Sequence, residues 1–351
     1  MTSVAVVSRQ GAASLMRDDR RRLERVADMR YHALEHAPSR AEAATLLADV
    51  DVLAATNACL PTLDVALLDV LSELRAVVLY ATGYDHVDVD LLTSRGVGLC
   101  VLPDYATNAV AEHAIAMLLS MATRLHLAHD RSRGVAPIDV SLRGVELAGR
   151  TMGVVGVGRI GTRVAQLGEA LGMRVIGYDH AVDAVQTARG RGLFMTTRDT
   201  VLATADALMI CASHGFGAPP AIGPAELATV RAHAFVVNAA RADLVDTRAT
   251  IAAIRQGLLR GYAVDDVVVD SVEDGDLLAQ GRVLQTAHSA WWRDEVLDRG
   301  RRMWARHLLA AIEDAPLDAV TWPVGCRPAR RAAADGRHRP STVADGLVAI
   351  P

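Results

Sequence analysis

Short apolar segments alternate with amphipathic segments along most of the chain. In the first part the apolar runs are V-A-V-V at Val4–Val7, V-D-V-L-A-A at Val50–Ala55 and R-A-V-V-L-Y at Arg75–Tyr80. Strand-length apolar runs separated by helix-length segments are typical of parallel sheets with crossover helices. From Asn108 to Leu127 the apolar residues recur at helical spacing, which predicts one long helix.

A second series of apolar runs follows a polar connection. The segment Asp130–Gly144 contains glycine and proline and predicts a link between two domains. From Thr151 the chain continues with M-G-V-V-G-V-G-R-I-G, R-V-I-G-Y-D, A-L-M-I-C-A, A-F-V-V-N-A-A and G-Y-A-V-D-D-V. Strands of this kind with helices between them predict a doubly wound sheet. The last amphipathic helix, around Glu295–Glu313, is expected to return to the first domain.

These patterns predict an α/β protein of two domains with doubly wound parallel sheets. The length of 351 residues exceeds what one compact core usually holds. Residues 1–121 together with 295–325 are expected to form one discontinuous domain, and residues 122–294 the second, with a cleft between them. Residues 326–351 are rich in arginine, alanine and proline without periodicity, and we expect a mostly disordered tail.

Composition excludes several classes of protein. No apolar window approaches the ~18 residues that span a bilayer, and the first ten residues lack a signal-peptide pattern, so we expect a cytoplasmic protein. The four cysteines show neither C-x-x-C pairing nor metal spacing, and no metal is expected. A net charge of -4 gives no reason to expect nucleic acid or membrane as partner. The chain contains no lysine, which sets aside Schiff-base enzymes and P-loop NTPases.

One glycine-rich motif predicts a dinucleotide site. The run G-V-G-R-I-G fits G-x-G-x-x-G and stands between an apolar strand and a helix. Its glycines permit a tight turn and close backbone approach, and the helix N-terminus offers free N–H groups to a pyrophosphate. The alternative is a turn that only lets helix and strand pack. The residues expected to hold the cofactor here are Gly156, Gly158, Arg159, Ile160 and Gly161.

An aspartate ends the next strand. Asp179 lies eighteen positions after Gly161, where a carboxylate can accept hydrogen bonds from the adenosine ribose. Its charge would repel a 2′-phosphate, and the following residue is His180 rather than an arginine, so NAD is favoured over NADP. The alternative role for Asp179 is to cap the following helix.

Several separated motifs resemble one enzyme family. Four motifs are involved: A-T-G-Y-D-H-V-D-V-D at Ala81–Asp90, Y-A-T-N-A-V-A-E-H-A at Tyr105–Ala114, G-V-G-R-I-G, and V-N-A-A-R-A-D-L-V-D at Val237–Asp246. Together they resemble the NAD-dependent D-2-hydroxyacid dehydrogenases over about residues 50–320. The resemblance implies a flavodoxin-like substrate domain, a Rossmann domain and an active site in the cleft. It also implies hydride transfer between NAD(H) and C2 of a small 2-oxo or 2-hydroxy acid, in the reductive direction.

The resemblance assigns the substrate site residue by residue. Arg241, in N-A-A-R, matches the arginine that binds the substrate carboxylate and carbonyl, for which a planar guanidinium suits. The backbone amides of Thr82 and Gly83 match the loop that grips the same carboxylate. His288 matches the acid/base histidine. Trp291, in A-W-W, resembles the tryptophan of C-terminal-binding-protein-like members; it would line the pocket and favour an apolar or aromatic tail, or else belong to the core.

The cofactor environment departs from the family pattern in one loop. Asp265 matches the aspartate that receives the nicotinamide carboxamide, and Ala239 falls beside the cofactor. The usual His-x-Pro-Leu-Thr run after the fourth strand is replaced by Cys211-Ala212-Ser213-His214-Gly215. Cys211 is therefore expected to face the cofactor in an altered environment.

Two further departures concern the histidine. The family glutamate that pairs with it is replaced by Asp270, whose side chain is one methylene shorter. We expect Asp270 to be the catalytic partner of His288, with Glu273 as the substitute if the loop is rebuilt. The proline that precedes the histidine in relatives is Ala287 here.

A rival hypothesis belongs to another functional class. Related corepressor-like proteins suggest an NAD-sensing regulatory scaffold in which a degraded catalytic pair serves regulation. Assays with 2-oxo acids distinguish the two. Besides its small-molecule substrate the chain is expected to bind a second copy of itself, because the helix from Asn108 and the arm Asp130–Gly144 resemble the dimer elements of relatives.

Overall fold

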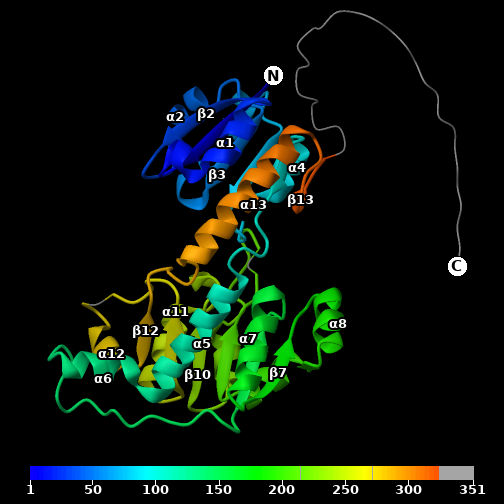
Figure 1. Cartoon of the computed structure of the whole chain (residues 1–351). Helices are drawn as coiled ribbons and strands as arrows, with labels where there is room; N and C mark the ends of the chain where they lie inside the picture. The colour runs from blue at the N-terminus through cyan, green and yellow to red at the C-terminus, as the bar shows by residue number, and fades with distance from the viewer. Residues whose placement is uncertain (214, 271, 324–351) are drawn as a thin grey trace, which may run out of the picture.

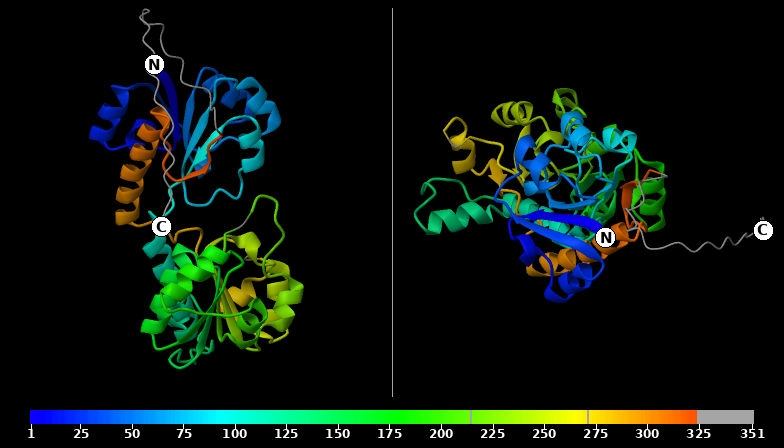
Figure 2. Two further views of the ribbon diagram at one scale, coloured as in Figure 1. Left: turned by 90° about the vertical axis from the view of Figure 1, so that its right-hand side faces the viewer. Right: turned by 90° about the horizontal axis from the view of Figure 1, so that it is seen from above.

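The computed structural model describes residues 1–213, 215–270 and 272–323. Figures 1 and 2 show two lobes, each built around one sheet, with the N-terminus in the first lobe. Within the described ranges no helix has both the length and the apolar character needed to cross a lipid bilayer. The predicted tail, residues 326–351, lies outside the described residues.

The first lobe contains a six-stranded sheet in the order β13-β5-β4-β3-β1-β2. Neighbouring strands are parallel except for the antiparallel pair β13 and β5. Val4 of β1 is aligned with Met29 of β2 and with Val52 of β3. The strands are β1 (Thr2–Ser8), β2 (Ala27–Ala33), β3 (Val52–Thr56), β4 (Ala76–Tyr80), β5 (Gly98–Cys100) and β13 (Ala319–Thr321).

Helices cover both faces of this sheet, which explains the continuous apolar runs of its strands. Val4 and Val6 enter one core cluster, whereas Ala5 and Val7 enter the cluster on the opposite face. Trp304 on the last helix is fully buried, and its Nε1 donates to Val78 O at 3.0 Å. The helices are η1 (Gly11–Ser14), α1 (Arg17–Glu24), α2 (Arg40–Leu46), η2 (Asn57–Cys59), α3 (Val65–Val70), α4 (Val89–Ser94) and α13 (Asp294–Ile312).

The second lobe contains a parallel seven-stranded sheet in the order β12-β11-β10-β9-β6-β7-β8. The edge strands β8 and β12 have only two and three residues, so no apolar run marks them in the sequence. The predicted α/β class with two doubly wound sheets is confirmed. The strands are β6 (Thr151–Val155), β7 (Arg174–Tyr178), β8 (Phe194–Met195), β9 (Ala207–Ile210), β10 (Ala234–Asn238), β11 (Leu259–Val264) and β12 (Val283–Gln285).

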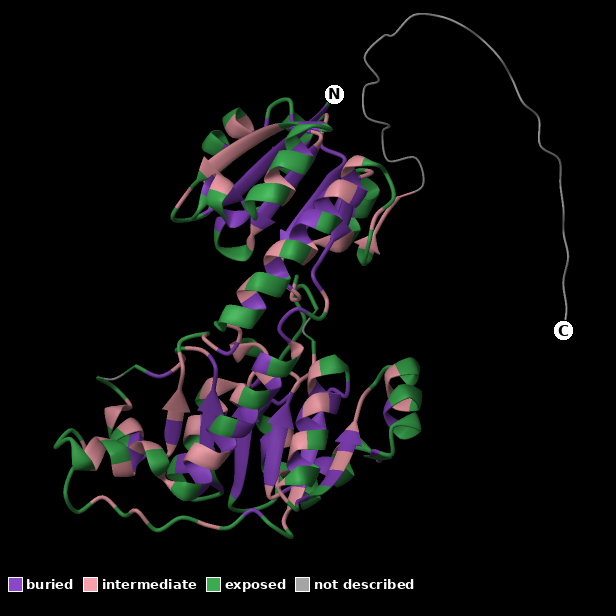
Figure 3. Cartoon of the chain, viewed as in Figure 1, coloured by how far each residue is buried: buried purple, intermediate pink, exposed green. Residues whose placement is uncertain are grey.

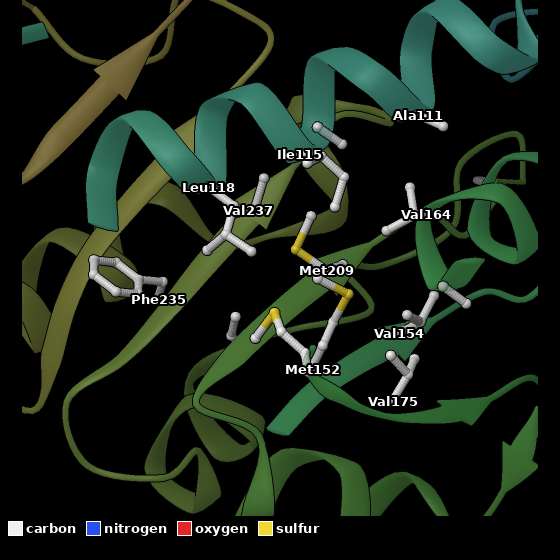
Figure 4. Close-up of a cluster of buried hydrophobic side chains, with 14 of the residues drawn as sticks. Ala111, Ile115, Leu118, Met152, Val154, Val164, Val175, Met209, Phe235 and Val237 are labelled. Atoms are coloured by element: carbon white, nitrogen blue, oxygen red, sulfur yellow. The ribbon is translucent and has the colours of Figure 1, made fainter. Parts of the chain in front are cut away.

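One long helix packs across this second sheet. Figure 4 shows Ile115 and Leu118 of α5 facing Met209 and Val237 of the sheet. The predicted domain boundary at residue 121 assigned this helix to the first domain, but its apolar face contacts the second sheet. The helices of this lobe are α5 (Thr107–Thr123), α6 (Leu125–Ser132), α7 (Arg159–Ala170), α8 (Val182–Gly190), α9 (Arg198–Thr204), α10 (Pro224–Thr229), η3 (Ala242–Leu244), α11 (Thr247–Arg255) and α12 (Gly275–Ala279).

The helix predicted from Asn108 to Leu127 is interrupted. Arg124 has a left-handed backbone, with φ of 63°, which ends α5 and starts α6. Its Nη2 donates to Gln280 O at 2.6 Å and its Nε donates to Ser141 O at 3.2 Å. These contacts with distant segments favour the break, although the apolar spacing continues through it.

Candidate active site

A cleft of about 1110 Å³ lies between the two sheets. Its walls include the residues that directly follow the carboxyl ends of strands from both lobes, such as Arg9 after β1, Ala81 after β4, Gly156 after β6 and Cys211 after β9. Ligands of doubly wound α/β folds bind at this edge of the sheet. The topology of the two sheets, rather than proximity in sequence, therefore brings the candidate site residues together.

The G-x-G-x-x-G motif forms a turn in which the space beside one of the three glycines is empty. Gly156 has φ of +89°, and a Cβ there would collide with the backbone of Ala212. A Cβ at Gly161 would overlap the carbonyl oxygen of Gly156. At Gly158, by contrast, no atom lies within 4 Å of an added Cβ. A side chain would collide with backbone at Gly156 and Gly161, whereas the space at Gly158 is empty, so a pyrophosphate can approach the backbone there. This favours a binding role for the motif over packing alone.

The helix that follows this turn points its N-terminus at the cleft. α7 begins at Arg159, directly after Gly158, and both Arg159 and Ile160 line the cleft. The first amide N–H groups of a helix attract anions. Arg159 Nη1 also donates to Pro103 O at 3.3 Å, so this residue connects the two lobes. The turn and helix fit a dinucleotide pyrophosphate.

Asp179 lies in the cleft beside this turn. Its Oδ2 accepts a hydrogen bond from Val157 N at 2.8 Å, and its Oδ1 accepts one from Ala181 N at 2.9 Å. Each carboxylate oxygen keeps a second lone pair that a ribose hydroxyl can use. Asp179 thus stabilises the turn before α8 and can also accept bonds from a ribose.

Small residues complete the cofactor side of the cleft. Cys211 follows β9 and Ala239 follows β10, and both line the cleft. Burial raises the pKa of the Cys211 thiol to about 12. The thiol therefore stays protonated at neutral pH and acts as an apolar contact rather than a nucleophile.

A buried asparagine shapes the loop that carries Arg241. Asn238 is only 1% exposed; its Nδ2 donates to Arg241 O at 2.7 Å, and its Oδ1 accepts from Ala240 N at 3.0 Å. These two bonds close the turn after β10 and direct Arg241 into the cleft. The N-A-A-R motif therefore contains a structural residue that the sequence analysis did not assign.

The Arg241 guanidinium reaches across the cleft to the first lobe. Its Nε donates to Asp85 Oδ1 at 2.8 Å, and Nη1 donates to Ala240 O at 3.0 Å. A Cβ at Gly83 would collide with Arg241 Nη2, so the two residues are in close contact. Asp85, which the sequence analysis missed, orients the guanidinium through Nε and leaves its Nη edge to a ligand.

The loop around Gly83 provides free donors. Thr82 Oγ1 donates to Leu102 O at 2.7 Å, which fixes the loop after β4. The amide N–H groups of Thr82 and Gly83 have no acceptor among the described residues. Two unpaired amides beside a guanidinium are donors that can bind a carboxylate.

His288 projects from a tight turn into the same cleft. Ala287 and His288 have φ of 40° and 54°, and Ser289 N donates to Thr286 O at 3.2 Å. Two consecutive positive φ values with such a bond are typical of a type I′ turn. His288 is exposed and lines the cleft together with Arg241.

The turn explains the departure at Ala287. Proline is fixed at φ near −65° and cannot adopt the value of 40° observed here. We expect Ala287→Pro to destabilise the protein by more than about 1 kcal/mol and to lower turnover, while Ala287→Gly leaves both nearly unchanged. Thermal unfolding midpoints of the three proteins test this. A proline variant as stable as wild type would show that the loop does not adopt this turn.

Asp265 anchors the histidine turn. Its Oδ1 accepts from Thr286 Oγ1 and from Ser289 N, both at 2.8 Å, and its Oδ2 accepts from Ala290 N at 2.9 Å. The predicted role was to receive the nicotinamide carboxamide. In the structure this buried carboxylate binds the loop that carries His288 and also lines the cleft, and its contact with the carboxamide stays a prediction.

A second histidine extends this network. His113 Nδ1 accepts from Arg293 Nη2 at 3.2 Å, so its Nε2 is the donor to Thr286 Oγ1 at 2.9 Å. Burial lowers the pKa of His113, and the charge of Arg293 acts in the same direction while Asp265 opposes it. The neutral ring therefore connects α5 to the turn before α13. No sequence motif assigned this role to His113.

The structure does not bring Asp270 to His288. Asp270 is exposed, and its Oδ1 accepts from Val272 N at 2.6 Å within its own turn. Glu273, the predicted substitute, is also exposed. Among the residues that the structure describes, neither carboxylate forms a hydrogen bond or ion pair with His288. The expected acid/base pair is therefore not found, because the loop after β11 directs Asp270 into a local cap.

The two tryptophans border the cleft near the start of α13. Trp291 and Trp292 pack edge to face, with ring centroids 5.0 Å apart. Trp291 also packs against the core of the first lobe, whereas Trp292 is 58% exposed. Both predicted roles for Trp291, pocket wall and core residue, thus apply together.

These features define a two-lobed dinucleotide-binding protein whose cleft contains an arginine beside free amides and a histidine. Residues 115–290 match the model of the NAD binding domain of the D-isomer specific 2-hydroxyacid dehydrogenases. The chain belongs to this family, as its motifs predicted, and its cofactor is NAD.

Named relatives cover most of the chain. D-3-phosphoglycerate dehydrogenase of Mycobacterium leprae is 32% identical over 75% of this chain and 49% of its own length. Glyoxylate reductase of Pyrococcus furiosus is 30% identical over 68% of this chain and 72% of its own length. The chain thus spans about half the length of the mycobacterial relatives that it matches.

Solved structures share the fold. The glyoxylate reductase of Paecilomyes thermophila superposes with a TM-score of 0.80 at 21% identity, covering 91% of this chain and 98% of that chain. At this identity the similarity shows the two-lobed architecture alone.

Proposed function

We propose that this chain is an oxidoreductase that transfers a hydride between NAD(H) and C2 of a small 2-oxo or 2-hydroxy acid, in the reductive direction. The observation that carries the proposal is the contact of the Arg241 guanidinium with Gly83, in the same cleft as His288 and the glycine turn. A carboxylate site, an acid/base group and a dinucleotide site are the parts that this reaction requires.

Arg241 and the free amides of Thr82 and Gly83 bind and orient the substrate carboxylate. Because Asp85 occupies Nε and Ala240 O takes one hydrogen of Nη1, Nη2 and the second hydrogen of Nη1 remain for the carboxylate and the neighbouring carbonyl oxygen. Bidentate bonds of this kind fix the plane of the 2-oxo acid and polarise its carbonyl group.

His288 supplies the proton in this scheme. NAD, when bound, supplies the hydride chemistry at C2. The histidine donates a proton to the carbonyl oxygen during reduction and removes it in the reverse direction. Asp265 positions the histidine by holding the backbone N–H groups of Ser289 and Ala290, and His113 supports Asp265 through Thr286.

Oxidation of NADH in the presence of a panel of 2-oxo acids tests the proposal. The expected result is turnover with at least one member. A second candidate, an NAD-sensing regulatory scaffold, is retained because in the described part of the chain no carboxylate pairs with His288. Tight NADH binding without turnover on any 2-oxo acid would support that candidate.

Cofactor choice should follow Asp179. Wild type should bind NADH more tightly than NADPH, because the carboxylate repels a 2′-phosphate. Asp179→Ala should narrow this preference, although loss of the bonds to Val157 and Ala181 should weaken the binding of both cofactors. Calorimetric titration with both cofactors measures this, and equal binding of the two by wild type would refute the assignment.

A homodimer fits an exposed apolar arm of the second lobe. Figure 3 shows the long segment that follows α6 as mostly exposed. Val135 and Ile138 in that segment are 65% and 84% exposed. Two-fold pairing through this arm would cover them. Light scattering at micromolar concentration should give twice the chain mass, and a monomer would contradict the proposal.

A further inference from the structure

A group of polar and cationic side chains lines the part of the cleft that belongs to the first lobe and lies beyond the carboxylate site. We call it the distal patch; it consists of Arg9, Gln10 and Arg301. Neither the hydride transfer nor the cofactor site uses these residues. They come from the end of β1 and from α13.

Arg301 is the better-fixed member of the distal patch. It is half-buried, and its Nη2 donates to Gln10 Oε1 at 3.3 Å. It lies one turn after Leu297, whose carbonyl accepts a hydrogen bond from the Tyr80 hydroxyl at 3.3 Å. Burial raises the pKa of Tyr80 to about 12, and the positive charge of Arg301 opposes this rise. Arg301 is therefore close to the residue that leads into the Thr82–Gly83 loop.

Neither arginine of the distal patch has a carboxylate partner among the residues that the structure describes. Arg9 Nε donates to Glu35 O at 3.1 Å, which leaves its Nη atoms available. In the described ranges neither Arg9 nor Arg301 forms an ion pair. Asp298 lies one turn before Arg301 and also influences Tyr80, but it does not line the cleft.

Of the five acidic residues that line the described cleft, four are engaged elsewhere, and the fifth, Asp90, lies in the first turn of α4. Asp85 pairs with Arg241, Asp88 caps α4, Asp179 binds the glycine turn and Asp265 binds the histidine turn. None of the acidic residues that line the described cleft comes from β1, β3 or α13. The distal patch thus has an excess of positive charge inside a cleft that is built for a small acid.

Strand and helix spacings place the distal patch about 10 Å from the loop after β4 and about 10 Å from the start of α13. In the first sheet β1 is two strands from β4, and neighbouring strands are about 4.8 Å apart. Along α13, Arg301 lies seven residues after Asp294, at about 1.5 Å per residue from the helix end that follows the histidine turn. The arginine side chains reach back over part of this distance.

From this arrangement we infer that the distal patch binds a second carboxylate of the substrate. The substrate is then a 2-oxo dicarboxylic acid, with its 2-oxo carboxylate at Arg241 and its far carboxylate, several carbon atoms away, at Arg301 and Arg9. This inference rests on the proposed function and narrows it. The guanidinium fork of arginine matches a carboxylate in a half-buried site.

A pair of substrates of equal length tests the inference. We expect wild type to use 2-oxoadipate at least about tenfold better in kcat/KM than 2-oxohexanoate, which lacks only the second carboxylate. Arg301→Gln should remove most of this preference by raising KM for 2-oxoadipate, with 2-oxohexanoate unchanged. Arg9→Gln should act in the same direction with a smaller effect, because Arg9 is exposed. Arg302→Gln, at an exposed neighbour outside the cleft, is the matched control and should alter neither substrate.

Several results would overturn the inference. They are equal use of the two acids by wild type, an equal loss on both in Arg301→Gln, or a higher rate with a 2-oxo acid that ends in a phosphate ester. Calorimetric binding of both acids to the NADH complex keeps the test independent of turnover. If no 2-oxo acid is reduced, the proposed function fails; if only the preference is missing, the distal patch assignment alone fails.

Discussion

Replacing Arg241 by lysine should lower kcat/KM for the best 2-oxo acid by about a hundredfold or more, since charge-assisted hydrogen bonds each contribute about 1.5–3 kcal/mol. The guanidinium contacts Gly83, bonds Asp85 through Nε and presents its Nη edge to the ligand. A lysine ammonium is a point charge and cannot reproduce three directed contacts.

The control for this prediction is Arg248→Lys, at an exposed position of α11 outside the cleft. It should leave kcat/KM unchanged, and both variants should unfold at temperatures near that of wild type. Steady-state kinetics with saturating NADH provide the measurement. A lysine variant at position 241 that stays within about threefold of wild type excludes the loss of two such bonds.

Replacing His288 by glutamine should lower kcat by about 10²–10⁴-fold, the range typical of general acid catalysis. The binding of NADH should change little, because no protein hydrogen bond or ion pair in the described chain depends on the imidazole. The side chain is exposed in the cleft, so the variant should fold normally.

The Asp270→Asn variant should be measured together with His288→Gln. Since Asp270 caps its own turn and does not contact His288, we expect its kcat and the pH profile of reduction to match wild type. If His288→Gln retains most activity, the histidine is not the proton donor. If instead Asp270→Asn shifts the pH profile, the loop after β11 must rearrange during turnover.

The parts of the site that local sequence determines were predictable. A glycine turn between a strand and a helix needs only neighbouring residues, and Gly156, Gly158 and Gly161 each have the environment that the motif implies. Arg241 and His288 were predicted through family resemblance, and the topology brings them into one cleft. The position of each of these residues follows from the end of the strand that precedes it in the sequence.

The roles that depend on distant contacts were not predictable. Asp265 and His113 are far apart in sequence, and only the folded loop brings Thr286 between them. The positive φ values at Ala287 and His288 could not be predicted, because an Ala-His dipeptide is not a sequence typical of a turn with positive φ.

The prediction of the long helix failed for the same reason, namely contacts with distant segments. Apolar spacing predicted one helix through Arg124, whereas its bonds to Gln280 and Ser141 accompany a break there. Periodicity describes a helix face but carries no information about which distant carbonyl groups lie within reach of its side chains.

Transfer of a labelled hydride to C2 is the sharpest test of the proposed reaction. NADH in which both hydrogens at C4 of the nicotinamide are replaced by deuterium is incubated with the protein and a panel of 2-oxo acids, and the products are analysed by mass spectrometry and chiral chromatography. We expect one deuterium at C2 of a 2-hydroxy acid with a single, D configuration, and formation of this product at least about a hundredfold more slowly with the His288→Gln variant. Complete retention of the deuterium in NADH with every 2-oxo acid, despite tight binding of the cofactor, would contradict it.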